Sequence, residues 1–145
     1  MAEVLLLEPD TILADTYMKA LAYFGHHTRR TVSAQDAVFK VDELRPDIII
    51  VELQLVAHSG IEFLYELRSY AEWQDIPVII HSCVPPNEFS DSHKLLRDRL
   101  GVQHYLYKPQ TSLQTLVRAV REITAIPEPA YEKQFLVKDA LSLPA

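Results

Sequence analysis

The chain has 145 residues, about the size of one ordinary domain. It is 48% hydrophobic and 23% charged with a formal net charge of −6, which argues against a mainly disordered chain and against non-specific nucleic-acid binding. A single cysteine excludes an internal disulfide framework, and no apolar run is long enough to span a bilayer. The first residues lack a basic segment ahead of an apolar one, as a signal peptide would have. We therefore expect a cytoplasmic domain that binds neither membrane nor nucleic acid directly.

Short apolar runs alternate along the chain with longer segments of helical spacing. The apolar runs predict strands over residues 4–7, 48–51 and 78–80, with two weaker candidates at 27–32 and 104–107. The intervening segments predict helices over residues 13–24, 34–44, 61–70, 90–100 and 113–123. Asp10 and Ser33 are the expected N-caps of the first two helices, and Gly25 is the expected stop of the first.

This order repeats one strand and one helix five times. Strands joined by crossover helices form a parallel sheet with helices on both faces, so the chain predicts a doubly wound (βα)5 α/β fold, a three-layer sandwich around a five-stranded parallel sheet. We assign residues 1–125 to this domain, because two prolines, Pro127 and Pro129, interrupt the last helix. Residues 126–145 are expected to form a C-terminal tail that docks on the domain or is partly disordered, or else an arm that binds a partner or forms a dimer.

Polar side chains stand immediately after the predicted strands. Sheets of this kind bind their ligands at the carboxyl ends of the strands, so these side chains are expected to share one crevice. They are Glu8, Asp10, Glu52, Ser82 and Lys108. Carboxylates beside a hydroxyl and an ammonium are typical of a site for a divalent cation or for a phosphoryl group carried by a carboxylate. The loop after the first strand has no glycine, which disfavours a dinucleotide or P-loop site.

Five pieces of the sequence, in order, resemble the receiver domain of two-component response regulators, which has a flavodoxin-like fold. They are LLLEPD at 5–10, PDIIIVE at 46–52, Gly60, PVIIHS at 77–82 and GVQHYLYKP at 101–109. The resemblance covers residues 4–123. It implies that an aspartate after the third strand accepts a phosphoryl group from a histidine kinase and that an acidic pair after the first strand holds Mg²⁺. A Ser or Thr and a Lys would bind the phosphoryl oxygens, which corresponds here to Ser82 and Lys108, while Tyr105 takes the position of the switch aromatic.

Two positions depart from the family pattern. Glu52 stands at the phosphoacceptor position, where its extra methylene moves the carboxylate off the in-line geometry that phosphoryl transfer needs. Pro9 replaces one residue of the acidic pair, which leaves Glu8 and Asp10 as the acidic pocket, with Asp10 displaced by one residue. We therefore expect no catalytic activity and no cofactor, with weak Mg²⁺ binding at most. Glu52 is either a partial mimic of a phosphorylated aspartate or the mark of a decayed site.

Two expectations concern individual side chains in the crevice. Lys108 is expected to form an ion pair with Glu52 or Glu8, at a crevice mouth that is open to water. Cys83 is expected to be a small buried hydrophobe rather than a reactive thiol.

The resemblance implies a stand-alone atypical receiver that acts through protein–protein interaction, with a histidine kinase or a downstream effector as partner and a homodimer as a further possibility. The expected recognition surface comprises the fourth helix, the fifth strand and the fifth helix, with candidates His93, Lys94, Arg97, Tyr105, Tyr107, Arg118 and Glu122. The alternative is a working Mg²⁺-dependent phosphoacceptor that uses Glu52 or Asp10. A small-ligand-binding flavodoxin-like domain is a weaker alternative, because no loop offers the hydroxyl and amide groups that would hold a flavin phosphate.

Overall fold

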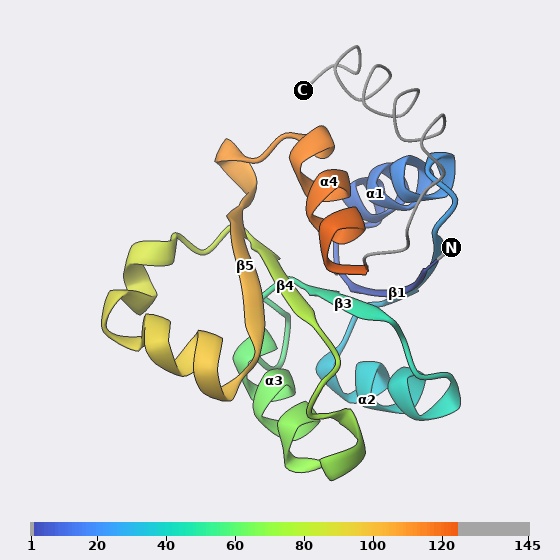
Figure 1. Cartoon of the computed structure of the whole chain (residues 1–145). Helices are drawn as coiled ribbons and strands as arrows, with labels where there is room; N and C mark the ends of the chain where they lie inside the picture. Colours follow the sequence, from blue (N-terminus) through green and yellow to red (C-terminus); the bar gives the residue numbers. More distant parts are fainter. Residues whose placement is uncertain (1, 125–145) are drawn as a thin grey trace.

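The computed structural model describes residues 2–124, which form a single parallel β-sheet with helices on both faces (Figure 1). The strand order in the sheet is β2-β1-β3-β4-β5, and every pairing is parallel. The strands are β1 (Glu3–Leu7), β2 (His27–Thr31), β3 (Ile48–Val51), β4 (Val78–Ser82) and β5 (Val102–Tyr107). This arrangement confirms the predicted doubly wound α/β fold. The predicted tail, residues 126–145, lies outside the described residues.

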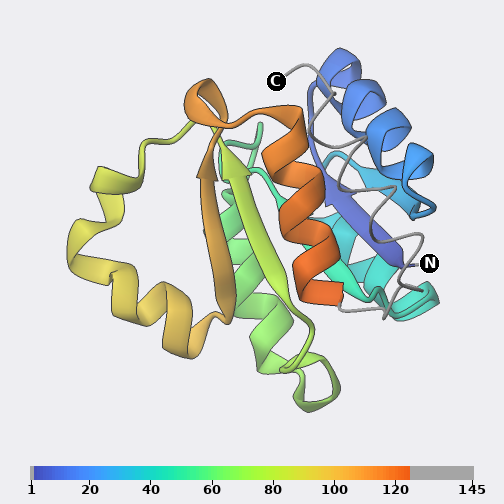
Figure 2. The same ribbon diagram turned by 45° about the horizontal axis from the view of Figure 1, so that its top comes forward.

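The strands alternate their side chains between two apolar cores, which explains the three layers (Figure 2). Leu5 and Ile49 point to the face covered by α2 (Ala34–Glu43) and α3 (Gly60–Ser69). Leu6 and Ile50 point to the face covered by α1 (Thr11–Tyr23) and α4 (Leu113–Thr124). Because both faces are covered, the central strands read as continuous apolar runs in the sequence.

The ends of the helices follow the predicted capping residues. Asp10 accepts a hydrogen bond from the backbone N–H of Leu13 at 2.9 Å, and Ser33 accepts one from Asp36 at 3.1 Å. Gly25 follows α1 with φ +86°, a conformation that a residue with a side chain rarely adopts. These local signals therefore fix where α1 and α2 begin and where α1 ends.

The fourth helical region differs from the prediction of one helix over residues 90–100. It consists of a 3-10 helix, η2 (Pro86–Ser92), and a short π-helix, η3 (Leu95–Arg99). Phe89 has the non-helical angles φ −113° and ψ 21°, and Leu96 is the buried side chain of η3. A regular α-helix needs a continuous apolar stripe to hold it against the sheet. This segment has too few buried side chains to impose one, so the prediction of a regular helix is wrong.

Two further 3-10 turns lie at strand boundaries, η1 (Ala71–Trp73) before β4 and η4 (Lys108–Gln110) after β5. Within residues 2–124, none of the helices combines the length and the hydrophobicity needed to cross a lipid bilayer.

Candidate functional site

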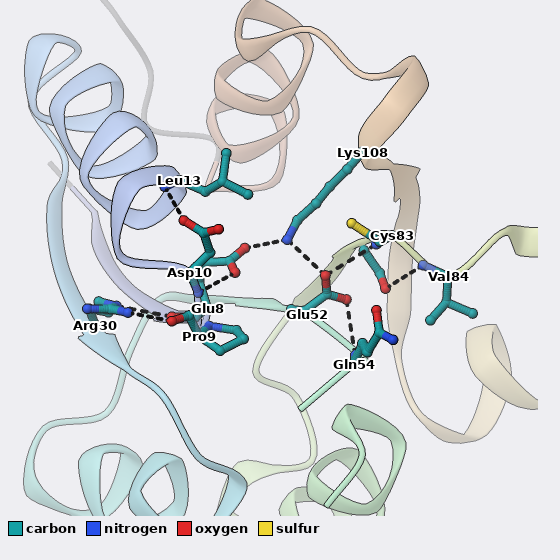
Figure 3. Close-up of polar contacts among 11 residues, drawn as sticks. Glu8, Pro9, Asp10, Leu13, Arg30, Glu52, Gln54, Cys83, Val84 and Lys108 are labelled. Carbon is teal, nitrogen blue, oxygen red and sulfur yellow. Dashed lines mark hydrogen bonds and ion pairs between the residues drawn. The ribbon is translucent and has the colours of Figure 1, made fainter. Parts of the chain in front are cut away.

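Lys108 lies between two glutamates at the carboxyl ends of the central strands (Figure 3). Glu8 follows β1, Glu52 follows β3, and Lys108 follows β5. The Lys108 Nζ is 2.5 Å from Oε1 of Glu8 and 2.8 Å from Oε1 of Glu52. The predicted ion pair is therefore direct, and one ammonium binds both carboxylates.

Backbone N–H groups of three loops also donate hydrogen bonds to the two carboxylates. The N–H of Asp10 donates to Oε2 of Glu8 at 3.0 Å, and the N–H of Gln54 donates to Oε2 of Glu52 at 3.1 Å. The N–H of Cys83 donates to Oε1 of Glu52 at 3.2 Å. Each of the four carboxylate oxygens thus accepts at least one hydrogen bond from the chain itself.

The cluster is buried, which corrects the expectation of a crevice mouth open to water. The side chain of Lys108 is 9% exposed, that of Glu8 3% and that of Glu52 4%. Backbone N–H groups of three loops contact these buried carboxylates (Figure 3). Removing one partner of a buried ion pair costs far more folding free energy than removing one partner of an exposed pair, because the remaining charge stays buried.

For both Glu52 and Lys108, the effect of hydrogen bonds on the pKa outweighs the effect of burial. Burial alone would raise the pKa of Glu52, but hydrogen bonds from Lys108, the Ser82 hydroxyl and the Gln54 backbone lower this pKa below its ordinary value. Burial alone would lower the pKa of Lys108, but its hydrogen bonds to Glu52 and Glu8 raise it. Both groups are therefore charged at neutral pH.

Ser82 and Tyr105 both hold the loop that follows β4. The Ser82 hydroxyl, which is fully buried, accepts a hydrogen bond from the backbone N–H of Val84 at 3.0 Å. The Tyr105 hydroxyl donates to the carbonyl oxygen of Val84 at 2.7 Å, and its ring lies 6.1 Å from that of Phe89. Burial raises the pKa of Tyr105 to about 12, so its hydroxyl remains a donor at neutral pH. The loop is tied from both sides to the strands that carry the ion pairs.

The residues at the acidic pocket do not fit the Mg²⁺ ion that the family pattern implies. The Asp10 carboxylate caps α1 and points to Leu13 (Figure 3). Both oxygens of Glu8 are already bound, and the carbonyl oxygen of Pro9 accepts a hydrogen bond from Arg30 Nη2 at 3.0 Å. Within residues 2–124, no three His, Cys, Asp or Glu side chains are grouped so that they could hold a metal ion. The oxygen atoms that would serve as Mg²⁺ ligands thus already accept hydrogen bonds from the protein itself.

Two neighbours of the cluster were not predicted as parts of the site. His81 is 4% exposed, and its ring lies 4.9 Å from that of Tyr17 in an edge-on contact. Within the described residues its Nδ1 has no hydrogen-bond partner, and burial, with the nearby Lys108 charge, lowers its pKa to about 4. Burial likewise raises the pKa of Tyr17 to about 12. The alternation of β4 toward α1 is the one signal that could have placed His81 beside Tyr17.

Cys83 is exposed, which corrects the expectation of a buried side chain. It follows the last residue of β4, where the chain leaves the sheet, and its backbone N–H turns toward Glu52 (Figure 3). This orientation could not be predicted from the sequence, because the alternation of side chains along β4 ends at Ser82.

The model of the response regulator receiver domain matches residues 4–121. The chain belongs to this family. Among curated relatives, the KDP operon transcriptional regulatory protein KdpE of Escherichia coli is 29% identical over 135 residues, covering 89% of this chain. Protein PilH of Pseudomonas aeruginosa is 23% identical over 125 residues, covering 86% of this chain. This chain spans 56% of the length of KdpE and 99% of that of PilH.

Solved structures of similar fold include a sensor protein and a chemotaxis protein. A sensor protein from Polaromonas sp. JS666 superposes with a TM-score of 0.75 at 20% identity, covering 84% of this chain and 94% of that one. Chemotaxis protein CheY4 of Vibrio cholerae superposes with a TM-score of 0.72 at 20% identity, covering 85% and 98%. These likenesses confirm the receiver fold.

Proposed function

We propose that this receiver domain works in two-component signalling by protein–protein contact and accepts a phosphoryl group poorly or not at all. The observation that carries the proposal is the state of the two glutamates, all four of whose oxygens accept hydrogen bonds from Lys108 or from backbone N–H groups. A phosphoacceptor must present a free carboxylate oxygen in line with the donor. We place this function in the cytoplasm, as the sequence leads us to expect.

The position of the Glu52 carboxylate adds a second reason. Phosphoryl transfer depends almost entirely on positioning and on charge stabilisation, so a carboxylate displaced by one methylene loses much of the rate. Glu52 contacts Lys108, Gln54 and Cys83 at once, which fixes it in the displaced position. Glu8 and Asp10 are engaged in other contacts, so they are poorly placed to hold the Mg²⁺ ion whose positive charge stabilises a transferred phosphoryl group.

Mimicry of a phosphorylated aspartate is favoured over decay by the partners of Glu52. Its carboxylate contacts Lys108, and the Ser82 hydroxyl helps to lower its pKa; these are the two positions that bind phosphoryl oxygens in the family pattern. It also holds the N–H of Cys83, next to the loop that Tyr105 ties down through Val84. The negative charge of Glu52 therefore holds this loop without phosphorylation.

The surface that we propose for partner binding joins η2, η3, β5 and α4. Five of its candidate residues are exposed and two tyrosines of β5 are half-buried. The exposed ones are His93, Lys94, Arg97, Arg118 and Glu122. A histidine kinase, a downstream effector or a second copy of this chain is the partner that this surface would bind. Independent action without an attached output domain stays a prediction.

Intact-mass measurement of the full chain after incubation with acetyl phosphate and Mg²⁺ tests this function. We expect no gain of a phosphoryl group, because each oxygen of Glu8 and Glu52 already accepts a hydrogen bond and the carboxylate of Asp10 caps α1. Glu52→Asp alone should restore little uptake, whereas Glu52→Asp combined with Pro9→Asp should restore much more. A stoichiometric gain on the unmodified chain that disappears in Glu52→Gln would establish the alternative, a working phosphoacceptor.

A further inference from the structure

A hollow lies near the amino-terminal ends of β4 and β5, whereas the cluster of Glu8, Glu52 and Lys108 lies at the carboxyl ends of the strands. It has a volume of about 510 Å³, within the range of small-molecule sites. Its lining residues come from the end of α3, from the segment before β4 and from η3, close to the start of β5. The lining residues are Tyr65, Arg68, Ser69, Gln74, Asp98, Arg99 and Leu100.

Arg68 supplies a fixed positive charge to one wall of this hollow. Its guanidinium donates from Nε to the carbonyl of Leu100 at 3.0 Å, from Nη1 to that of Trp73 at 2.8 Å and from Nη2 to that of Ile76 at 2.7 Å. A Cβ at Gly101 would lie 2.5 Å from the same Nη2, which shows how tightly the group is packed. Within residues 2–124 no carboxylate forms a salt bridge with Arg68, whose charge is compensated by three carbonyl dipoles and, at longer range, by the charge of Asp75.

Arg99 adds a second positive charge that the surrounding structure leaves uncommitted. It is exposed on η3, and among the described residues no hydrogen bond or ion pair engages its guanidinium. The one carboxylate in the lining, Asp98, pairs instead with Arg97 at 3.6 Å. The hollow is therefore electropositive, with two guanidinium groups that suit the planar geometry of a carboxylate or a phosphate.

One wall of the hollow offers an apolar contact beside the charge. Tyr65, in the lining, is 45% exposed, whereas Leu100 is 2% exposed and offers little surface. The Ser69 hydroxyl donates to the carbonyl oxygen of Glu66, and one N–H of the Gln74 amide donates to that of Arg68. The Tyr65 ring is thus the apolar surface that a ligand could cover.

We propose that this hollow binds a small organic anion, whose carboxylate or phosphate group pairs with Arg99 and Arg68 and whose flat part covers Tyr65. The proposal stands apart from the proposed function, because the hollow shares no residue with the cluster of Glu8, Glu52 and Lys108. The ligand needs one anionic group attached to a ring. The experiment below distinguishes a carboxylate from a phosphate as that group.

Titration of the ¹⁵N-labelled full chain, followed by amide chemical shifts, tests the proposal with three probes of similar shape. Benzoate and phenyl phosphate carry the two anionic groups, and benzamide is the neutral control. We expect saturable shifts at Ser69, Gln74 and Gly101 with at least one anion, with a dissociation constant on the order of 1 mM. Benzamide should bind at least about tenfold more weakly, because it lacks the charge. The tighter of the two anions identifies the preferred group.

Two variants in or next to the same short helix provide a matched pair. Arg99→Gln should weaken binding of the preferred anion by about tenfold or more, since it removes a charge-assisted contact. Lys94→Gln removes an exposed positive charge just before η3, outside the lining, and should alter binding by less than about twofold. Both positions are exposed, and unchanged amide shifts elsewhere will establish that the variants fold. No saturable shift at about 20 mM anion, equal binding of benzamide, or equal losses in the two variants would overturn the proposal.

Discussion

At the scale of single residues, Glu52 illustrates how one methylene changes the use of a carboxylate. The longer side chain brings its oxygens to the ammonium of Lys108 and to two backbone N–H groups, those of Gln54 and Cys83. The same contacts keep its pKa below the ordinary value although the group is buried. Under the proposed function, Glu52 serves as a fixed acceptor of hydrogen bonds rather than as a phosphoacceptor.

His81 should make the stability of the protein depend on pH between about 6.5 and 4. Burial lowers its pKa from 6.5 to about 4, so in this window the unfolded chain binds the proton and the folded chain does not. Stability is therefore full above pH 6.5 and falls as the pH drops toward 4, by up to about 3 kcal/mol. Glu52, whose pKa is lowered, adds a further loss below its ordinary value of 4.5.

Urea unfolding at a series of pH values measures this dependence. His81→Leu removes the titrating ring, and it should flatten the profile between pH 6.5 and 4. Val56→Ala is the control, because Val56 is exposed and carries no titratable group, so this variant should keep the slope of the unmodified protein. A His81→Leu profile with the same slope as that of the unmodified protein would contradict the assignment.

The site residues divide into those that the sequence predicts and those that it does not. The pairing of Lys108 and the capping role open to Asp10 follow from strand ends and local spacing, and both are found. The shared ammonium and the burial of the cluster depend on how loops distant in sequence fold over the carboxylates. The exposure of Cys83 has the same origin, because it lies beyond the strand pattern.

At the scale of secondary-structure elements, Gly60 determines how closely α3 approaches the end of β3. A Cβ at this position would lie 2.6 Å from the carbonyl oxygen of Glu52 and 2.8 Å from Cγ1 of Val51. The backbone of Glu52 cannot yield without moving the carboxylate and its partners. The glycine therefore couples the packing of α3 to the geometry of the site.

Gly60→Ala should destabilise the protein by about 1–3 kcal/mol, the usual cost of forcing extra atoms into a packed region. It should also shift the amide resonances of Gln54 and Cys83, which donate to Glu52. Gly25→Ala is the control, since a Cβ there meets no atom within 4 Å and its cost comes from the positive φ alone. Unchanged amide resonances of Gln54 and Cys83 in Gly60→Ala would contradict the coupling.

The elements themselves were predictable to the extent that one local signal dominates them. Continuous apolar runs such as residues 48–51 predict buried strands, and Asp10 and Ser33 predict where helices begin. The segment from Pro86 to Arg99 has weak helical spacing and little burial, so neighbouring contacts such as that of Phe89 with Tyr105 decide its shape. Such tertiary effects cannot be read from spacing alone.

At the scale of the whole molecule, the cluster joins segments that are far apart in sequence. Lys108 lies 100 residues from Glu8 and 56 residues from Glu52 along the chain. Its contacts tie β5 to β1 and β3, and the backbone donors add the loops after β1, β3 and β4. We therefore propose that the cluster is a buried clamp across the carboxyl ends of the strands rather than a phosphoacceptor site.

A double-mutant cycle of Glu52→Gln and Lys108→Met, measured by urea unfolding, tests that claim most directly. Loss of Lys108 leaves two buried carboxylates unpaired, so this variant should lose about 3–5 kcal/mol, and the pair should show a coupling energy of about 1–3 kcal/mol. The same cycle on the exposed pair of Arg45 and Asp75, 2.8 Å apart, should give negligible coupling. A coupling between Glu52 and Lys108 as small as that of the exposed pair would contradict the buried clamp.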